Sequence, residues 1–268
     1  MEKHLHIICF TVPYPITYGG VFDLYYKLEA LYKQGIHIHL HCFVYNKMQE
    51  QNELTKYCTT VNYYKRNKSF LGLLNNLPFI VFSRKNKILL NNLLKNDYPI
   101  LMEGIHCSYL VTDKRFTDRK KFIRLHNIES VYYAELAKAE KSFFKKWYYK
   151  RESRLLKKYE DLIKNKADNF ICVAQKDEET LLKFGFTNAT YVPVFLPNWQ
   201  IKNSIESEKY CLYHGDLSVV TNEGVVLWLY ENIFKKINTQ FIIAGKNPTQ
   251  KIKSITNNSP NIKLIANP

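Results

Sequence analysis

The segment from Phe122 to Glu129 holds the densest group of polar side chains that could take part in a reaction. His126 follows an apolar run that predicts a strand, and Glu129 stands where the next helix should begin. A histidine at a strand end faces the cleft where α/β proteins bind ligands, and it exchanges protons near neutral pH. We therefore predict a catalytic role for His126 and binding roles for Asn127 and Glu129, with a structural histidine as the alternative.

A second polar loop, Glu103-Gly104-Ile105-His106, follows the preceding apolar run. Gly104 allows a ligand to approach the backbone closely, and the Glu103 carboxylate can bind a hydroxyl group. We predict Glu103 as the second catalytic residue.

The beginning of the chain joins a predicted strand to a helix through a proline-rich loop that ends at Gly19 and Gly20. These glycines expose backbone N–H groups that could bind an anion or a sugar. The pair does not match the G-x-G-x-x-G fingerprint, and no acidic residue follows the second strand, so a nicotinamide cofactor is not expected. A tight turn without a ligand is the alternative. Gly35 is predicted to end the helix.

His37, His39 and His41 alternate along the second predicted strand, so their side chains project from one face, about 7 Å apart. Such spacing can build a metal site, but no fourth ligand is evident. We therefore expect no metal.

Strand-like apolar runs alternate with helical patterns along the chain, which predicts an α/β fold with a parallel sheet and helices on both faces. Ligands gather at the carboxyl ends of such strands, here in the loops after Phe10, Met102 and Leu125. The predicted strands lie at residues 4–10, 36–44, 60–65, 99–106, 120–126 and 169–174.

A polar segment at residues 198–209 predicts a boundary between a domain of residues 1–197 and a second one of residues 198–268. Three strands and two helices are about half of a doubly wound domain, so we expect the second domain to be incomplete. Its strands are predicted at 211–214, 241–244 and 262–265, and its helices at 222–236 and 249–257.

Two strand ends of the second domain could bind a nucleotide diphosphate. Gly215 lies at the first, where we expect Asn222 to cap the following helix, and Gly245 and Lys246 lie at the second. Helix N-termini and a lysine attract phosphate. Structural turns are the competing interpretation.

The formal net charge of +15 indicates acidic partners, whether nucleotide, nucleic acid or an anionic membrane. The six cysteines lack C-x-x-C spacing and are expected to be buried and reduced. No apolar run is long enough for a membrane span and the N-terminus does not resemble a signal peptide, so we expect a cytoplasmic protein.

Residues 141–166 contain ten basic and three acidic residues, interleaved with aromatic residues. Such a helix could lie on an anionic membrane. We favour a surface helix whose aromatic side chains pack inward.

Four segments together resemble the GT-B glycosyltransferases of the broad "glycosyltransferase group 1" type. They are Val12-Pro-Tyr-Pro with Gly19-Gly20, Arg124-x-His126-Asn127-x-Glu129, Tyr213-His-Gly-Asp-Leu-Ser218 with Asn222, and Ile243-Ala-Gly-Lys246-Asn-Pro248.

The resemblance implies two Rossmann-like, doubly wound domains, the first holding the acceptor and the second the nucleotide-sugar. Gly19 and Gly20 would face the donor phosphate and the acceptor, His126 would line the sugar site, and Lys246 would neutralise the leaving diphosphate. No metal or other cofactor is expected. The Glu-x7-Glu helix of the family should lie beyond residue 268, and Asp216 and Asn222 stand where many members have an Arg/Lys pair.

We therefore expect a hexosyltransferase-like enzyme of polysaccharide biosynthesis that transfers a sugar from a nucleotide-sugar to a glycan or lipid-linked acceptor. It would act in the cytoplasm, with peripheral contact at the inner face of an anionic membrane and without nucleic acid. The activity of the truncated chain is left open. The alternative is a non-catalytic module whose basic helix binds nucleic acid or an anionic membrane.

Overall fold

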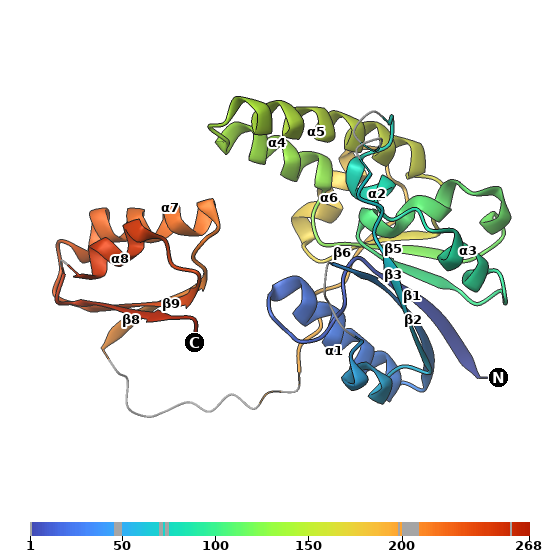
Figure 1. Cartoon of the computed structure of the whole chain (residues 1–268), viewed down its shortest axis with the longest axis horizontal. Coiled ribbons are helices and arrows are strands. Elements are labelled where there is room, and N and C mark those ends of the chain that lie inside the picture. Colours follow the sequence, from blue (N-terminus) through green and yellow to red (C-terminus); the bar gives the residue numbers. More distant parts are fainter. Residues whose placement is uncertain are drawn as a thin grey trace. The chain divides into compact units, whose positions relative to one another are not determined.

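The computed structural model describes residues 2–45, 50–69, 72, 75–197, 199, 209–257 and 259–268. They belong to two compact units, Met1–Trp199 and Gln200–Pro268 (Figure 1). Most of the polar segment 198–209, on which the predicted domain boundary was placed, lies outside the described residues.

The first unit is built on a parallel sheet of seven strands in the order β3-β2-β1-β4-β5-β6-β7. This confirms the predicted α/β fold class. The strands are β1 (Lys3–Cys9), β2 (Ile36–Val44), β3 (Thr60–Lys65), β4 (Ile100–Glu103), β5 (Lys121–Leu125), β6 (Asn169–Cys172) and β7 (Ala189–Tyr191). The short strand β7 was not predicted, because three residues are too few to show a period.

Helices and short 3-10 segments connect these strands. The α-helices of the first unit are α1 (Gly19–Lys33), α2 (Phe79–Phe82), α3 (Lys87–Leu93), α4 (Glu129–Ala139), α5 (Phe143–Ile163) and α6 (Gln175–Lys183). The 3-10 segments are Asn52–Lys56, Ile105–Thr112 and Lys114–Phe116. Gly35 follows the end of α1 with a φ of 73°, as its predicted role as a helix stop requires.

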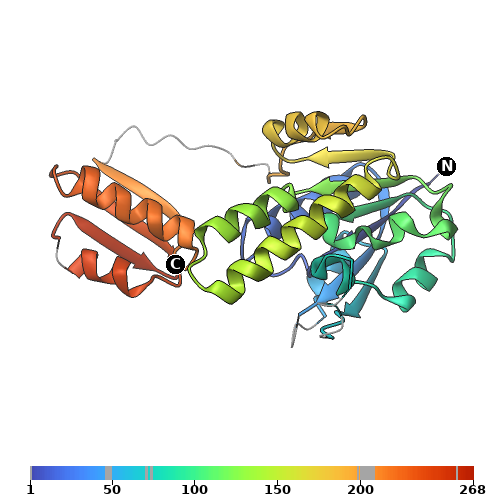
Figure 2. The same cartoon turned by 90° about the horizontal axis from the view of Figure 1, so that it is seen from above.

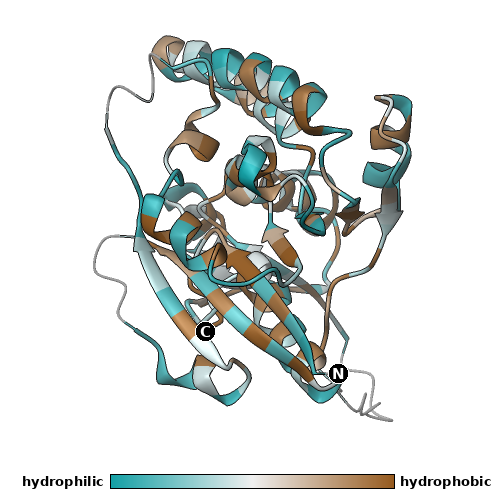
Figure 3. Ribbon diagram, turned by 90° about the vertical axis from the view of Figure 1, so that its right-hand side faces the viewer, coloured by the Kyte–Doolittle hydropathy of each residue, from teal (hydrophilic) through white to brown (hydrophobic). Residues whose placement is uncertain are grey.

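Each face of the sheet has its own hydrophobic core, because successive side chains of a strand point to opposite faces. Ile7 of β1 packs in one core with Leu24 and Leu28 of α1, whereas Ile8 packs in the other with Leu156 of α5. Figure 3 shows this alternation as teal and brown bands along the long strands.

The second unit has a parallel sheet in the order β10-β9-β8 and two α-helices. Its elements are β8 (Tyr210–Asp216), α7 (Val220–Leu229), a π-helical turn (Tyr230–Phe234), β9 (Gln240–Lys246), α8 (Gln250–Asn257) and β10 (Ile262–Ala266). The predicted cap is wrong, because α7 begins after Val219 and Asn222 lies within its first turn. The amide of Asn222 instead donates to the carbonyl of Asp216 at 2.9 Å.

Two expectations about burial are corrected. Cys211 is exposed, whereas the other five cysteines are buried. Phe143, Phe144 and Trp147 of α5 are exposed, so the favoured interpretation that the aromatic residues of this helix pack inward is wrong for these three. No helix in the described part of the chain has both the length and the apolar character needed to cross a bilayer.

Candidate functional site

A cavity of about 640 Å³ lies in the first unit where β1, β4 and β5 end. Phe10, Gly104 and His126 stand immediately after these strands, so the cavity occupies the carboxyl edge at which parallel sheets bind ligands. Its lining includes five of the predicted site residues, namely Gly19, Gly20, His126, Asn127 and Glu129. It also includes Tyr18, Phe22, Asp23, His106, Tyr132, Tyr133 and Val194.

Glu103, the other predicted catalytic residue, lies directly behind His126. The Glu103 Oε2 atom is 3.2 Å from Nε2 of His126, and the Glu103 side chain is fully buried at the end of β4. An ionised carboxylate can only accept a hydrogen bond, so His126 donates from Nε2. In the neutral imidazole, Nδ1 is then the nitrogen that can accept a proton.

Lys27 of α1 keeps Glu103 ionised. Its ammonium nitrogen is 2.6 Å from Oε1 of Glu103. Burial alone would raise the pKa of Glu103, but the charge of Lys27 and the hydrogen bond with His126 outweigh it, so the pKa is lowered. The carboxylate therefore stays available to orient the histidine.

Asp23 and Arg124 form a second buried pair beside the first. Burial would raise the pKa of Asp23, but the hydrogen bonds from Arg124 and the charge of Lys27 lower it. Arg124 also donates to the carbonyl oxygens of Val192 and Pro193, while Asp23 accepts from the backbone N–H of Phe195. The pair thus ties α1 and β5 to the segment that follows β7.

Sequence reasoning missed Asp23 and Lys27. The available signal was two opposite charges four residues apart on α1, directly after Gly19 and Gly20. Such a pair is ordinarily read as a solvated surface pair, and only the structure shows both side chains buried.

Glu129 begins α4 at the cavity wall. Burial raises its pKa to about 7, the nearby Glu160 adds to this shift, and a hydrogen bond with Asn127 opposes it. A carboxyl group that exchanges its proton near neutral pH is thus part of the lining.

A metal ion has candidate ligands here, because Asp23, Glu103 and His126 each offer an atom within 4.8 Å of the others. This is the one such cluster found in the part of the chain that the structure describes. The positive charges of Lys27 and Arg124 already neutralise the two carboxylates. A divalent cation bound here would be repelled by the charges of Lys27 and Arg124, so we keep the prediction that the protein works without a metal.

The predicted site residues of the second unit gather at the carboxyl ends of β8 and β9. Gly215 pairs in register with Gly245, and Asp216 pairs with Lys246. The pKa of Asp216 is lowered by hydrogen bonds from Ser218 and, to a smaller extent, by the charge of Lys246. Lys246 therefore lies beside a carboxylate at a strand end, where a phosphate would also be attracted to its charge.

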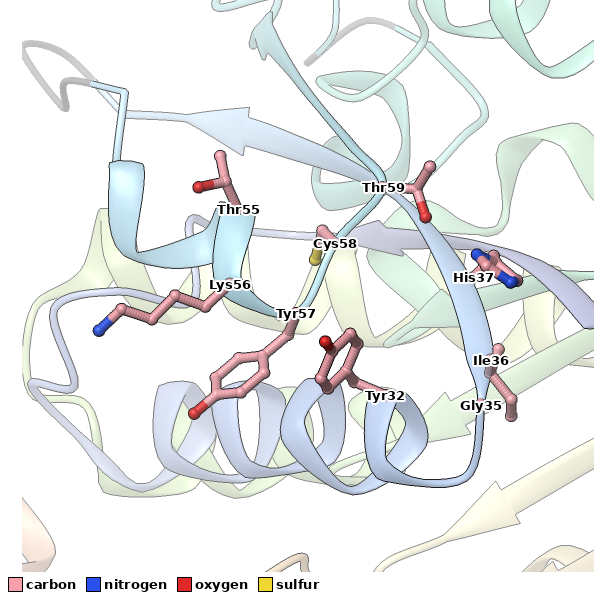
Figure 4. Close-up of a pocket in the computed structure, with 9 residues that line it drawn as sticks. All are labelled: Tyr32, Gly35, Ile36, His37, Thr55, Lys56, Tyr57, Cys58 and Thr59. Atoms are coloured by element: carbon pink, nitrogen blue, oxygen red, sulfur yellow. The ribbon is translucent and has the colours of Figure 1, made fainter.

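A smaller cavity of about 220 Å³ lies at the opposite edge of the sheet (Figure 4). It is lined by Tyr32, Gly35 and His37 around the start of β2, and by Thr55 and Tyr57 across from them. Figure 4 shows the Lys56 side chain extending away from it. Because the amino ends of parallel strands rarely hold the active site, we place the candidate site at the larger cavity.

The chain is similar to one curated protein and matches no family model. The curated protein is described as an uncharacterized 44.6 kDa protein in the cps region of Klebsiella pneumoniae and is 28% identical over 257 residues. The alignment covers 93% of this chain, which spans 63% of the length of that protein.

Solved structures resemble almost the whole chain at low sequence identity. Staphylococcus aureus TarM, in a complex that contains UDP, matches with a TM-score of 0.61 and 10% identity, covering 98% of this chain and 77% of TarM. Sucrose-phosphate synthase from Thermosynechococcus elongatus matches with a TM-score of 0.61 and 14% identity, covering 98% and 70%. Arabidopsis thaliana UGT89C1, complexed with UDP-L-rhamnose, matches with a TM-score of 0.55 and 14% identity, and the match covers 99% of this chain and 70% of UGT89C1. The chain therefore has the GT-B glycosyltransferase fold, as its motifs led us to expect.

Proposed function

We propose that this protein is a glycosyltransferase that transfers a sugar from a nucleotide-sugar to a glycan or lipid-linked acceptor. The observation that carries the proposal is the Glu103–His126 pair at the wall of a cavity formed by the strand ends of a GT-B fold. The solved relatives whose names include UDP or UDP-L-rhamnose support a nucleotide-sugar donor. Residues 1–197 would hold the acceptor, and residues 198–268 would contribute to the donor side.

The proposed reaction gives His126 the role of general base. The acceptor hydroxyl loses its proton to Nδ1 of His126 as its oxygen bonds to the anomeric carbon of the sugar. The bond between that carbon and the diphosphate oxygen breaks, and the diphosphate leaves with the electron pair. Glu103 stabilises the protonated imidazole, and Lys246 would neutralise the leaving diphosphate.

Calorimetry with UDP-sugars and GDP-sugars tests donor binding on this chain and on any longer form that the gene encodes. Sugar transfer is then measured in the form that binds. His126→Ala should slow transfer at least about 100-fold, the lower bound for loss of a general base, while circular dichroism shows that the fold is kept. His37→Ala, at the opposite edge of the sheet, is the matched control and should keep full activity. Absence of donor binding in every form would refute the proposal.

We also propose a cytoplasmic location at the inner membrane face and a role in polysaccharide biosynthesis. The related protein lies in a cps region, which supports the proposed role in polysaccharide biosynthesis. The basic α5 helix supports contact with an anionic membrane. Fractionation of cells that express a tagged protein tests the location. Recovery in the periplasmic or secreted fraction would contradict it.

A further inference from the structure

Helices α4 and α5 form an antiparallel hairpin that extends from the sheet of the first unit (Figure 2). The two helices are held together near the sheet, where Glu160 of α5 accepts hydrogen bonds from the backbone N–H and the hydroxyl of Ser130 of α4. Ser153 in turn donates to the carbonyl of Ser130 at 2.8 Å. The far end of the hairpin carries the turn that leads into Phe143.

Three large aromatic side chains are exposed at this far end. Phe143 is 77% exposed, Phe144 is 82% exposed and Trp147 is 61% exposed. Burying such rings in a nonpolar phase is favourable, and exposed clusters of this kind mark interaction sites.

Positive charges follow the rings along the same side of α5. Phe143, Trp147, Lys150 and Arg154 lie at i, i+4, i+7 and i+11 and therefore form one stripe. The buried residues of the helix, which include Leu156 and Tyr159, lie on the opposite side. The outward face thus places rings at its end and cations behind them.

The cations are available to bind anions. Within the described residues, Arg151 pairs with Glu152, but no salt bridge involves four other cations of α5. These four are Lys145, Lys146, Lys150 and Arg154. Three of them also line a cavity of about 550 Å³ between α4 and α5, together with the small side chains Ala134 and Ala137.

We propose that this hairpin tip, defined as Phe143, Phe144, Trp147 and the four cations, docks onto the surface of an anionic lipid bilayer. Along the stripe, Phe143 and Trp147 precede Lys150 and Arg154, which matches the depth profile of an interface, with the rings at the acyl boundary and these two cations at the phosphate layer. A nucleic acid would need rings spread along the helix on which successive bases could stack, but the exposed rings lie at the tip alone. A lipid surface therefore fits better.

Docking would bring the candidate site close to the membrane. Helix α4 begins at the cavity with Glu129 and ends at Ala139, which is about 16 Å at 1.5 Å per residue. A lipid-linked acceptor could therefore reach the cavity. This consequence rests on the proposed sugar transfer, whereas the docking deepens the proposed membrane location and does not depend on the transfer.

Vesicle sedimentation tests the proposal with phosphatidylcholine vesicles that contain or lack phosphatidylglycerol. The protein should sediment only with the anionic vesicles, and less at high salt. In a Trp199→Phe/Trp228→Phe background, the fluorescence of Trp147 should shift to the blue on binding. Absence of binding, or equal binding to both vesicles, would overturn the proposal.

A charge-reversal variant and a matched control make the test specific. Each basic residue near an anionic surface strengthens binding roughly fivefold, so reversing the four cations to Glu should weaken binding more than about 100-fold. The control reverses the exposed Lys87, Lys95, Lys114 and Lys120, reaches the same formal net charge and should weaken binding less than about tenfold. Equal losses in the two variants would refute a defined docking surface.

A second variant tests the rings. Replacing Phe143, Phe144 and Trp147 by Ser should weaken vesicle binding in the sedimentation assay at least about tenfold, since burying each ring in a nonpolar phase is favourable. Stronger binding to a single-stranded RNA than to anionic vesicles would instead assign the tip to nucleic acid. Ring-dependent self-association in analytical ultracentrifugation would assign it to a second copy of this chain. Either result would overturn the proposal.

Discussion

Asp23 and Arg124 are 101 positions apart in the sequence and form an ion pair through two hydrogen bonds of 2.9 and 3.0 Å. Both side chains are almost completely buried. This pair joins α1, which begins with Gly19 and Gly20, to the strand that precedes His126. The relative position of the two main loops of the candidate site therefore depends on it.

Breaking this pair should destabilise the protein strongly. In Arg124→Met the carboxylate of Asp23 loses its main partner inside the protein, and we expect a loss of about 3–5 kcal/mol in the free energy of unfolding, measured with urea. The control is Arg115→Met, which breaks the more exposed pair with Asp113 and should cost less than about 1 kcal/mol. Similar losses of unfolding free energy in the two variants would show that burial of the Asp23–Arg124 pair adds nothing to its contribution to stability.

Glu129→Gln should stabilise the protein above neutral pH. Burial raises the pKa of Glu129 to about 7, so ionisation costs stability as the pH rises from about 4.5, its ordinary value, through 7. The variant should gain up to about 3 kcal/mol at about pH 8 and nothing at about pH 4. Glu179→Gln, at an exposed position of α6, should change stability by less than about 0.5 kcal/mol. A gain independent of pH would contradict the titration of Glu129.

Acid should weaken the first unit through its histidines. Nδ1 of His6 lies 2.9 Å from Nε2 of His41, and burial lowers their pKa values to about 4 and about 3. Both must therefore stay neutral in the fold, and the stability present above about pH 6.5 is lost progressively as the pH falls toward these values. His6→Gln should reduce the loss between about pH 6.5 and 4 by about 3 kcal/mol. The exposed His37→Gln should leave the pH profile unchanged, and an identical profile for His6→Gln would contradict the prediction.

Gly245→Ala should unfold the second unit. A Cβ at this position would lie 1.8 Å from the carbonyl oxygen of Gly215, a backbone atom of the paired strand that cannot rotate away. Gly224→Ala is the matched control, because its Cβ would meet nothing within 4 Å and alanine favours a helix by about 1 kcal/mol. Heteronuclear NMR should show loss of the dispersed signals of β8 to β10 in the first variant only. Retained dispersion would show that the strands can separate enough to admit a methyl group.

The sequence was sufficient for most of the strands and for the edge of the sheet where the site lies. Hydrophobic period and Gly35 act locally, so most strands and the end of α1 were predicted close to their observed positions, whereas the short strand β7 was missed. Parallel strands present their carboxyl ends at one edge, so predicted loops that follow β1, β4 and β5 had to lie near one another. That rule brought Gly19, Gly20 and His126 to one cavity.

The sequence could not decide how the side chains pair or which of them meet solvent. The contacts of Asp23 with Arg124 and of Glu103 with His126 join distant segments, and no local pattern encodes such a meeting. A similar uncertainty affects α5, since helical period shows which residues share a face but not which face finds a partner. Only the tertiary structure shows that Phe143 is exposed and that Glu103 and Lys27 are buried behind His126. The burial of a residue depends on which distant segments the fold packs against it.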